Sequence, residues 1–188
     1  MTGYDFDKTI YKLDSSTGFF FYMIFTRPYL LLFFPWYLIV LMLYGLRILS
    51  KKKVKECLFF FVPWHKNIDK LVDKFWSKNA NKIFDWYSEQ RKEDDVVISA
   101  SLEFIIKPVM EMLRIKNYIA TNFDTKTGKI VGNNCYGEEK KILFEEKFGK
   151  VKLEAFYSDS MSDIPMMQIS DKAFLVKKGK PVEIEINK

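Results

Sequence analysis

Two acidic pairs in this 188-residue chain have the spacing and composition expected of a phosphoryl-transfer site. Asp5 and Asp7 lie near the start, and Asp159 and Asp163 lie in a serine-rich stretch near the end. Carboxylates brought close together repel one another unless a cation joins them. Oxygen ligands without histidine or cysteine favour Mg²⁺. Because a carboxylate can also attack phosphorus, the pairs indicate metal-assisted phosphoryl chemistry.

Two further segments add hydroxyl groups and a lysine. Ser99, Ala100 and Ser101 follow a short apolar run, and Lys140 lies at the start of an expected helix, three residues after Gly137. Phosphoryl transfer needs positive charge near the phosphate oxygens, which Mg²⁺ and a lysine can supply. Together, the four segments contain the groups that a phosphate-transferring site requires.

The elements that must position these segments alternate between strand and helix. Helices are expected over 102–113 and 138–148, and a small hairpin is expected between 123 and 135. Strands are expected just before residue 5 and over 96–98, 118–121, 153–157, 173–176 and 182–186. This order predicts an α/β fold with a parallel sheet flanked by helices. In such a sheet the site lies at the carboxyl ends of the strands, where the four segments would meet.

The first two expected strands are separated by about eighty residues, whereas an ordinary crossover needs roughly a dozen. We therefore predict a core made of residues 1–11 and 93–188, with residues 12–92 forming a helical, strongly apolar cap above the sheet. Residues 66–92 have a helical period of apolar side chains and many charges.

The predicted cap contains a run without charge, from Pro28 to Leu46, that has nearly the length of a membrane span. A single crossing would leave Asp5 and Ser99 on opposite sides of the bilayer, although both must reach one site. We therefore expect helices broken near Pro28 and Pro35.

Three partners for the apolar cap stay open: its own core, a second copy in a homodimer, or a membrane interface. Interfacial contact would suit the aromatic residues at 29, 36, 37 and 44, and anionic headgroups would suit Lys51–Lys53 and Lys55. Membrane contact would point to a lipid phosphate as substrate, and a small soluble phosphate stays open as the alternative.

The composition excludes several classes of function. The net charge of +6 suits an anionic partner, but no basic block with interleaved aromatics predicts nucleic-acid binding. The single histidine, His65, makes a histidine-based triad improbable. Two cysteines cannot form a disulfide framework, and the start does not resemble a signal peptide. We expect a cytoplasmic protein, peripheral on the cytoplasmic face of the membrane if the cap binds lipid.

The four segments resemble, in order, the four motifs of the haloacid dehalogenase (HAD) superfamily of phosphatases. Residues 5–9 match DxDxT, residues 97–99 match the apolar run that ends in serine, Lys140 matches the lysine motif, and residues 158–163 match the acidic motif. The sequences of residues 134–140 and 157–160 are similar to those of the branch that includes phosphoserine phosphatases and one class of phosphatidylglycerophosphate phosphatases. The resemblance implies a Rossmann-like HAD core.

The resemblance also implies a role for each motif residue in a Mg²⁺-dependent phosphomonoester hydrolase. The catalytic residues would be Asp5 as nucleophile, Asp7 as acid and base, and Lys140 as the neutralising cation. Phosphate would be held by Thr9, Ser99, Ala100 and Lys140, with Thr9 also supporting its own loop. The metal would be held by Asp5, Asp7, Asp159 and Asp163.

Other interpretations stay open. The fold could serve a membrane-associated binding protein with a degenerate site, a phosphotransferase or a dehalogenase. At single positions, Ser99 could cap the helix at 102, Asp163 could cap the helix that follows it, and Lys141 could replace Lys140.

Overall fold

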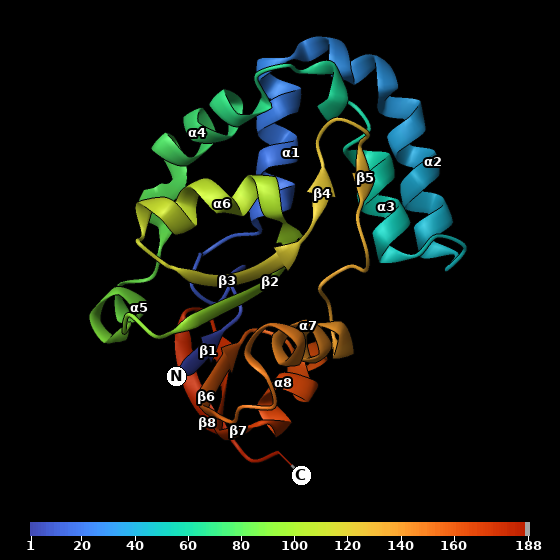
Figure 1. Cartoon of the computed structure of the whole chain (residues 1–188). Helices are drawn as coiled ribbons and strands as arrows, with labels where there is room; N and C mark the ends of the chain where they lie inside the picture. The colour runs from blue at the N-terminus through green and yellow to red at the C-terminus, as the bar shows by residue number, and fades with distance from the viewer. Residues whose placement is uncertain (187–188) are drawn as a thin grey trace.

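A six-stranded sheet of order β3-β2-β1-β6-β7-β8 organises the computed structural model, which describes residues 1–186 (Figure 1). Neighbouring strands are parallel except for the β7–β8 pair. The strands are β1 (Thr2–Tyr4), β2 (Val96–Leu102), β3 (Asn117–Thr121), β6 (Leu153–Ser158), β7 (Ser170–Lys177) and β8 (Lys180–Ile184). The predicted α/β fold is confirmed. The strand expected over 182–186 corresponds to β8, which pairs antiparallel with β7.

The short central strand β1 sets the position of the site. Tyr4 pairs with Val97 of β2 and with Tyr157 of β6, and the Asp5 amide donates to the Tyr157 carbonyl at 2.8 Å. The residues that follow β1, β2 and β6 therefore emerge at one edge. Gly3 is required here, because a Cβ would lie 2.7 Å from the Phe156 ring.

Helices cover both faces of the sheet. Alternate residues of β2 point to opposite faces, so Val97 joins one hydrophobic cluster and Val96 and Ile98 join another. The second cluster includes buried residues of α7 (Glu138–Phe148) and α8 (Ile164–Gln168), whereas α6 (Glu103–Met112) belongs to the first. The predicted hairpin is present as β4 (Phe123–Asp124) and β5 (Lys129–Ile130).

The segment between β1 and β2 is called the insert below. Its two ends are hydrogen-bonded to each other, so the chain enters and leaves the insert at the same place. The Lys12 amide donates to the Lys82 carbonyl at 3.0 Å, and the Phe84 amide donates to the Ile10 carbonyl at 2.9 Å. The helices between these points are α1 (Ser15–Thr26), α2 (Phe34–Gly45), α3 (Lys51–Leu58) and α4 (Ile68–Asn79), with 3₁₀ segments at Pro28–Phe33, Val62–Trp64 and Ala80–Lys82.

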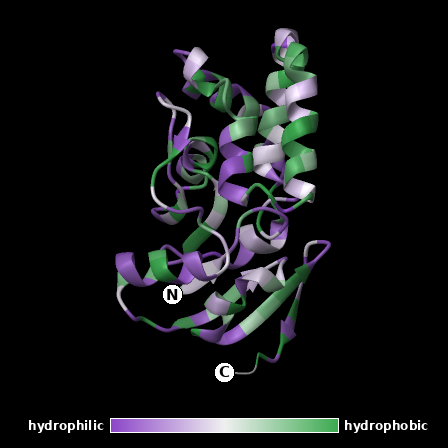
Figure 2. Cartoon of the chain, turned by 90° about the vertical axis from the view of Figure 1, so that its right-hand side faces the viewer, coloured by the Kyte–Doolittle hydropathy of each residue, from purple (hydrophilic) through white to green (hydrophobic). Residues whose placement is uncertain are grey.

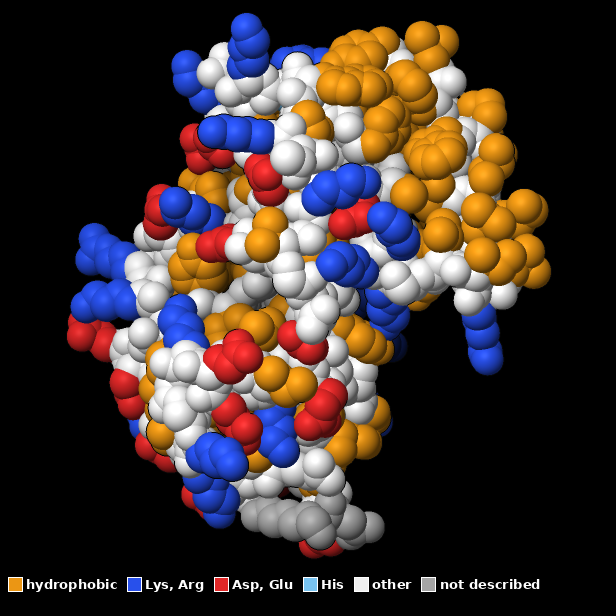
Figure 3. Space-filling view, turned by 45° about the vertical axis from the view of Figure 1, so that its right-hand side comes forward, with side chains coloured by type: hydrophobic (Ala, Val, Ile, Leu, Met, Phe, Trp, Pro, Cys, Tyr) orange, Lys and Arg blue, Asp and Glu red, His pale blue; other side chains and the backbone are white. Residues whose placement is uncertain are grey.

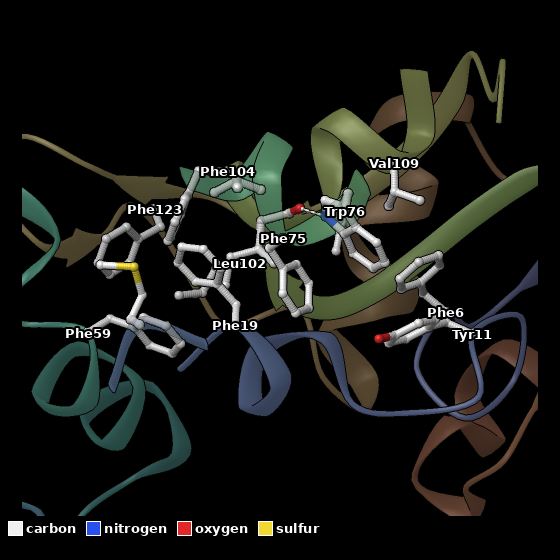
Figure 4. Close-up of a cluster of buried hydrophobic side chains, with 14 of the residues drawn as sticks. Phe6, Tyr11, Phe19, Phe59, Phe75, Trp76, Leu102, Phe104, Val109 and Phe123 are labelled. Carbon is white, nitrogen blue, oxygen red and sulfur yellow. Dashed lines mark hydrogen bonds between the residues drawn. The ribbon is translucent and has the colours of Figure 1, made fainter. Parts of the chain in front are cut away.

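The insert does not form a separate core. Phe19 of α1 and Phe75 of α4 pack edge-to-face, Phe19 also packs on Phe104 of α6, and the Trp76 indole donates to the Ile105 carbonyl at 2.6 Å (Figure 4). One hydrophobic cluster therefore joins the insert to α6. This shared packing fixes the insert above the carboxyl edge of the sheet (Figure 1).

The end of the predicted cap packs on the sheet itself. In α5 (Asp85–Gln90), Trp86 lies 5.5 Å from the Tyr157 ring and Tyr87 lies 5.0 Å from the Tyr4 ring, measured between ring centroids. Residues 84–90 thus pack on side chains of the central strands β1 and β6. The domain boundaries at residues 11 and 93 stay a prediction.

The helices of the insert are broken as expected near Pro28, where α1 has ended and a 3₁₀ segment begins. A second change occurs near Pro35, also as expected: the 3₁₀ segment ends at Phe33 and α2 begins at Phe34, with Pro35 in its first turn, where proline is well tolerated. By length and composition, Pro28–Gly45 is a candidate membrane span, and only 17% of it is buried within the chain. Viewed from the side of α2, the helices of the insert show both hydrophobic and hydrophilic colouring (Figure 2), and it is α2 whose residues are almost all apolar.

Candidate active site

A buried lysine links the first and last acidic motifs. The Nζ atom of Lys140, on the first turn of α7, lies 2.6 Å from Oδ1 of Asp5 and 2.7 Å from Oδ2 of Asp163. Asp163 also accepts a hydrogen bond from the Ser158 hydroxyl at 2.7 Å. Lys140, rather than Lys141, is therefore the lysine at the site. The Asp163 side chain makes no cap for α8.

Burial and charge oppose one another in this cluster. Burial raises the pKa of Asp5 to about 7, although the Lys140 ammonium acts to lower it. Burial acts to lower the pKa of Lys140, but the carboxylates of Asp5 and Asp163 outweigh it and raise the pKa above its usual range. Lys140 therefore stays charged, and it can neutralise an anion next to Asp5.

Asp7 is held at the start of α1, next to the sheet edge. Its Oδ1 accepts from the Ser15 amide at 2.7 Å, and its Oδ2 accepts from the Ser101 hydroxyl at 2.5 Å. Burial raises the pKa of Asp7 to about 6, with a further contribution from the charge of Asp14. The carboxyl group is fixed in orientation, as a proton donor to a bound substrate must be.

Thr9 holds the two acidic segments together. Its hydroxyl is fully buried and accepts a hydrogen bond from the Asp159 amide at 2.9 Å. Lys8, between Asp7 and Thr9, has a φ of 58°. This left-handed backbone conformation is costly for a residue with a side chain. Burial raises the pKa of Asp159, against the opposing charge of Lys8.

Ser99 and Ala100 lie within β2 rather than after it, because the strand extends to Leu102. Ser99 is buried, and its hydroxyl accepts from the Ser101 amide at 3.0 Å. Since Leu102 is the N-cap of α6, Ser99 does not cap that helix. The Ala100 carbonyl accepts from Lys55 Nζ and from the Thr121 hydroxyl, at 2.5 and 2.8 Å.

The roles of two residues near the site were missed by sequence reasoning. Ser101 contacts Asp7, and its position two residues after Ser99 in the same strand was a usable signal. Lys55 donates to Asn134 Oδ1 at 2.5 Å, and burial lowers the pKa of Lys55 to about 8. Lys55 was expected to suit anionic headgroups if the cap contacts a membrane, whereas in the structure its Nζ atom donates to the Ala100 carbonyl and to Asn134. No local pattern could have shown this.

A polar cavity of about 310 Å³ lies where these groups meet. It will be called the polar cavity. Thr9 and Ser99 do not line it, and their phosphate-binding roles stay predictions. The Nζ atom of Lys51 lies 3.2 Å from the centroid of the Tyr136 ring at the same cavity. The lining residues are Asp5, Asp7, Lys8, Asp14, Lys51, Ala100, Tyr136, Lys140, Asp159, Ser160, Ser162 and Asp163.

The donor set of the polar cavity fits Mg²⁺ when other oxygens complete the shell. Within residues 1–186, no three His, Cys, Asp or Glu side chains form a metal cluster by themselves. Mg²⁺ typically binds through one or two carboxylates, with waters and substrate phosphate as its other ligands. Asp163 Oδ1 is buried without a hydrogen-bond partner, which leaves an oxygen for an ordered water or an ion. Asp5 and Asp159 both line the polar cavity and are candidates for the carboxylates that would hold such an ion.

Comparison with known proteins gives partial matches at the sequence level. The chain is 36% identical to the protein CicA of Caulobacter vibrioides over 93 residues, which is 46% of this chain and 42% of CicA. It is 29% identical to a histidinol-phosphatase of Neisseria meningitidis over 109 residues, which is 50% of this chain and 47% of that protein. The matches thus span about half the length of these relatives.

Solved structures share the fold over most of the chain. A protein of unknown function from Bordetella pertussis Tohama I has a TM-score of 0.74 at 16% identity, covering 92% of this chain and 87% of that one. A phosphoserine phosphatase, solved as an analogue of its phospho-aspartyl intermediate, has a TM-score of 0.58 at 14% identity, covering 92% and 83%. The family model for haloacid dehalogenase-like hydrolases matches residues 2–168, so the chain belongs to that family, as predicted.

Proposed function

We propose that the protein is a Mg²⁺-dependent phosphomonoester hydrolase that forms an aspartyl-phosphate at Asp5. One observation carries the proposal: the Asp5 carboxylate lines a polar cavity, 2.6 Å from a buried lysine, with a second fixed carboxylate, Asp7, at the same cavity. A nucleophile, a charge-neutralising group and a proton donor are the parts that phosphate ester hydrolysis requires.

In the first step, a carboxylate oxygen of Asp5 attacks phosphorus and the bond from phosphorus to the ester oxygen breaks. Asp7 gives its proton to that oxygen, and the alcohol leaves. In the second step, a water attacks the same phosphorus while Asp7 takes up one of its protons. The acyl-phosphate bond then breaks, which releases inorganic phosphate and returns the Asp5 carboxylate.

The other residues of the site bind and orient the phosphate. Lys140 neutralises charge on Asp5 and on the transferring group, and Ala100 lines the cavity from β2. When bound between Asp5, Asp159 and the backbone carbonyl of Asp7, Mg²⁺ would supply further positive charge to the phosphate oxygens. Asp163 would position Lys140 and a water near the metal. The phosphatase names among the relatives support this proposal.

The proposal is tested by hydrolysis of p-nitrophenyl phosphate by the whole chain. We expect activity that is lost with EDTA and restored by Mg²⁺. Asp5→Asn should reduce hydrolysis to the level of the enzyme-free blank, because an amide is a poor nucleophile. Asp95→Asn is the matched control: Asp95 is buried at the opposite end of β2, where it accepts hydrogen bonds from two backbone amides. Activity that survives Asp5→Asn would refute the nucleophile assignment.

A further inference from the structure

A second cavity, of about 430 Å³, joins the polar cavity and extends into the insert. It will be called the apolar cavity. The two cavities share Asp7, Asp14, Lys51, Ala100 and Tyr136 in their linings. The remainder of the apolar cavity is lined largely by aromatic and aliphatic side chains, among them Phe20, Phe21, Tyr37, Leu41, Leu58 and Phe59. A ligand held by its phosphate near Asp7 would therefore extend its other end among apolar groups.

The apolar cavity reaches the surface of the molecule beside α2. Phe21 and Leu41 line the cavity, and they are also 52% and 51% exposed. Around them lies an apolar face, called the α2 face below, whose exposed members include Leu31, Leu32, Phe34, Leu38, Ile39 and Met42. Figure 3 shows that hydrophobic side chains gather on the side of the molecule where the insert lies. The inside of the cavity and the α2 face thus form one continuous apolar surface.

The surroundings of the α2 face fit a lipid surface better than a protein partner. No charged residue occurs between Arg27 and Arg47, and exposed Arg47 and Lys53 lie beyond the end of α2, where anionic headgroups would meet them. The partly exposed aromatic residues Trp36 and Tyr44 suit the headgroup level.

The position of the site limits the kind of membrane contact. Pro28–Gly45 is a candidate span by length and composition, but Asp5 precedes it, Ala100 follows it, and both line the polar cavity. A single crossing would place these two residues on opposite sides of the bilayer, so α2 can lie in one leaflet but cannot be a lone span. A helix in this position would place the mouth of the apolar cavity against lipid chains.

From this continuity we infer that the substrate is the phosphomonoester of a long-chain amphiphile, taken from a lipid surface on which the α2 face docks. The inference rests on the proposed function and specifies its substrate class. The phosphate enters the polar cavity, the chain occupies the apolar cavity, and the bonds that form and break are those of the two-step hydrolysis. Lys51 and Lys55 contribute positive charge where the two cavities meet.

Docking is tested without any enzyme activity, by flotation of the whole chain with vesicles of phosphatidylcholine and phosphatidylglycerol. We expect the wild-type chain to float with the vesicles. The double variant Leu38→Glu/Met42→Glu should stay in solution, because two carboxylates would enter the lipid. The matched control, Val151→Glu/Val182→Glu, adds the same charge at two exposed apolar positions outside the insert and should float like the wild type.

The substrate class is tested with butyl and dodecyl phosphate, both below the concentrations at which they form micelles. Each methylene group removed from water is worth roughly a fourfold gain in binding. Partial burial of the longer chain should therefore raise kcat/KM by at least about tenfold over butyl phosphate. Leu58→Trp narrows the apolar cavity and should lower this dodecyl-to-butyl ratio several-fold.

The outcomes separate the inference from the proposed function. Equal kcat/KM for the two phosphates, or a wild-type chain that stays in solution at low salt, would overturn the inference while leaving the hydrolase intact. So would a stable dimer that buries the α2 face and dissociates in the Leu38→Glu/Met42→Glu variant. If no phosphomonoester is hydrolysed, both the proposed function and the substrate class fail, and flotation still decides whether the α2 face docks on lipid.

Discussion

Helices α2 and α4 have the same length and lie in the same insert, but they differ in the kind of side chain that they expose to solvent. In α4, Ile68, Val72, Phe75 and Trp76 are buried and the outward positions are largely charged. In α2, only Tyr37 and Val40 are buried, and the outward positions are apolar as well.

The difference shows that burial within the chain does not explain the composition of α2. For α4, an apolar stripe on a charged helix is what a surface helix needs to pack on α6. For α2, two buried residues are enough to attach the helix, and the remaining apolar surface has no use in water. The outward face of α2 is therefore exposed apolar surface rather than part of the core, as the proposed docking on lipid requires.

The largest expected effect comes from a pair of tryptophans, one on each helix. The indole of Trp76 is fully buried and donates to the Ile105 carbonyl, whereas the indole of Trp36 is 42% exposed and donates to the Cys57 carbonyl. Trp76→Ala should lower the free energy of unfolding by about 3–5 kcal/mol. Trp36→Ala should lower it by about 1 kcal/mol, close to the value of one hydrogen bond.

Urea denaturation followed by circular dichroism measures both tryptophan variants. The comparison between the helices would break if the two losses were equal, since Trp36 would then be as well packed as Trp76. A Trp36→Ala variant that loses vesicle flotation would sharpen the comparison between the helices. Its small loss of stability would then accompany a large loss of lipid binding.

Much of the fold could be predicted because its signals are local. The apolar period of residues 66–76 predicted α4, and the turn residues from Asp124 to Gly128 predicted the hairpin. The order of strands and polar segments was enough to place Asp5 and Asp159 at one edge, since parallel strands leave their carboxyl ends together.

The parts that could not be predicted depend on contacts distant in sequence. Lys55 reaches Asn134 only because α3 lies beside the β4–β5 hairpin, where the buried Glu56 accepts a hydrogen bond from the Ile130 amide at 3.1 Å. The role of Ser101 was missed because β2 was expected to end at residue 98, which placed Ser101 in a loop. For Lys55 the tertiary arrangement, not the local pattern, decides that the side chain faces the site, whereas for Ser101 the alternation within a longer strand was the signal that was missed.

A smaller effect is expected from the valines that attach the two helices. Val72 of α4 and Val40 of α2 are both almost completely buried. Val72→Ala and Val40→Ala should each lower the free energy of unfolding by about 2 kcal/mol, from the loss of two buried methylene equivalents and incomplete collapse. Equal losses, measured by urea denaturation, would show that the inner side of α2 is ordinary protein core. A negligible loss for Val40→Ala would mean that α2 is not held against the insert in water.

The smallest effect on stability is expected from exchanging the outward faces. Leu38→Lys gives α2 a charge like those on α4, and Lys70→Leu gives α4 an apolar residue like those on α2; both positions are exposed. Each variant should change the free energy of unfolding by less than about 0.5 kcal/mol. Retention on a hydrophobic column should fall for Leu38→Lys and rise for Lys70→Leu. If Leu38→Lys instead cost several kcal/mol, Leu38 would be packed within the chain, and the apolar surface of α2 would need no partner.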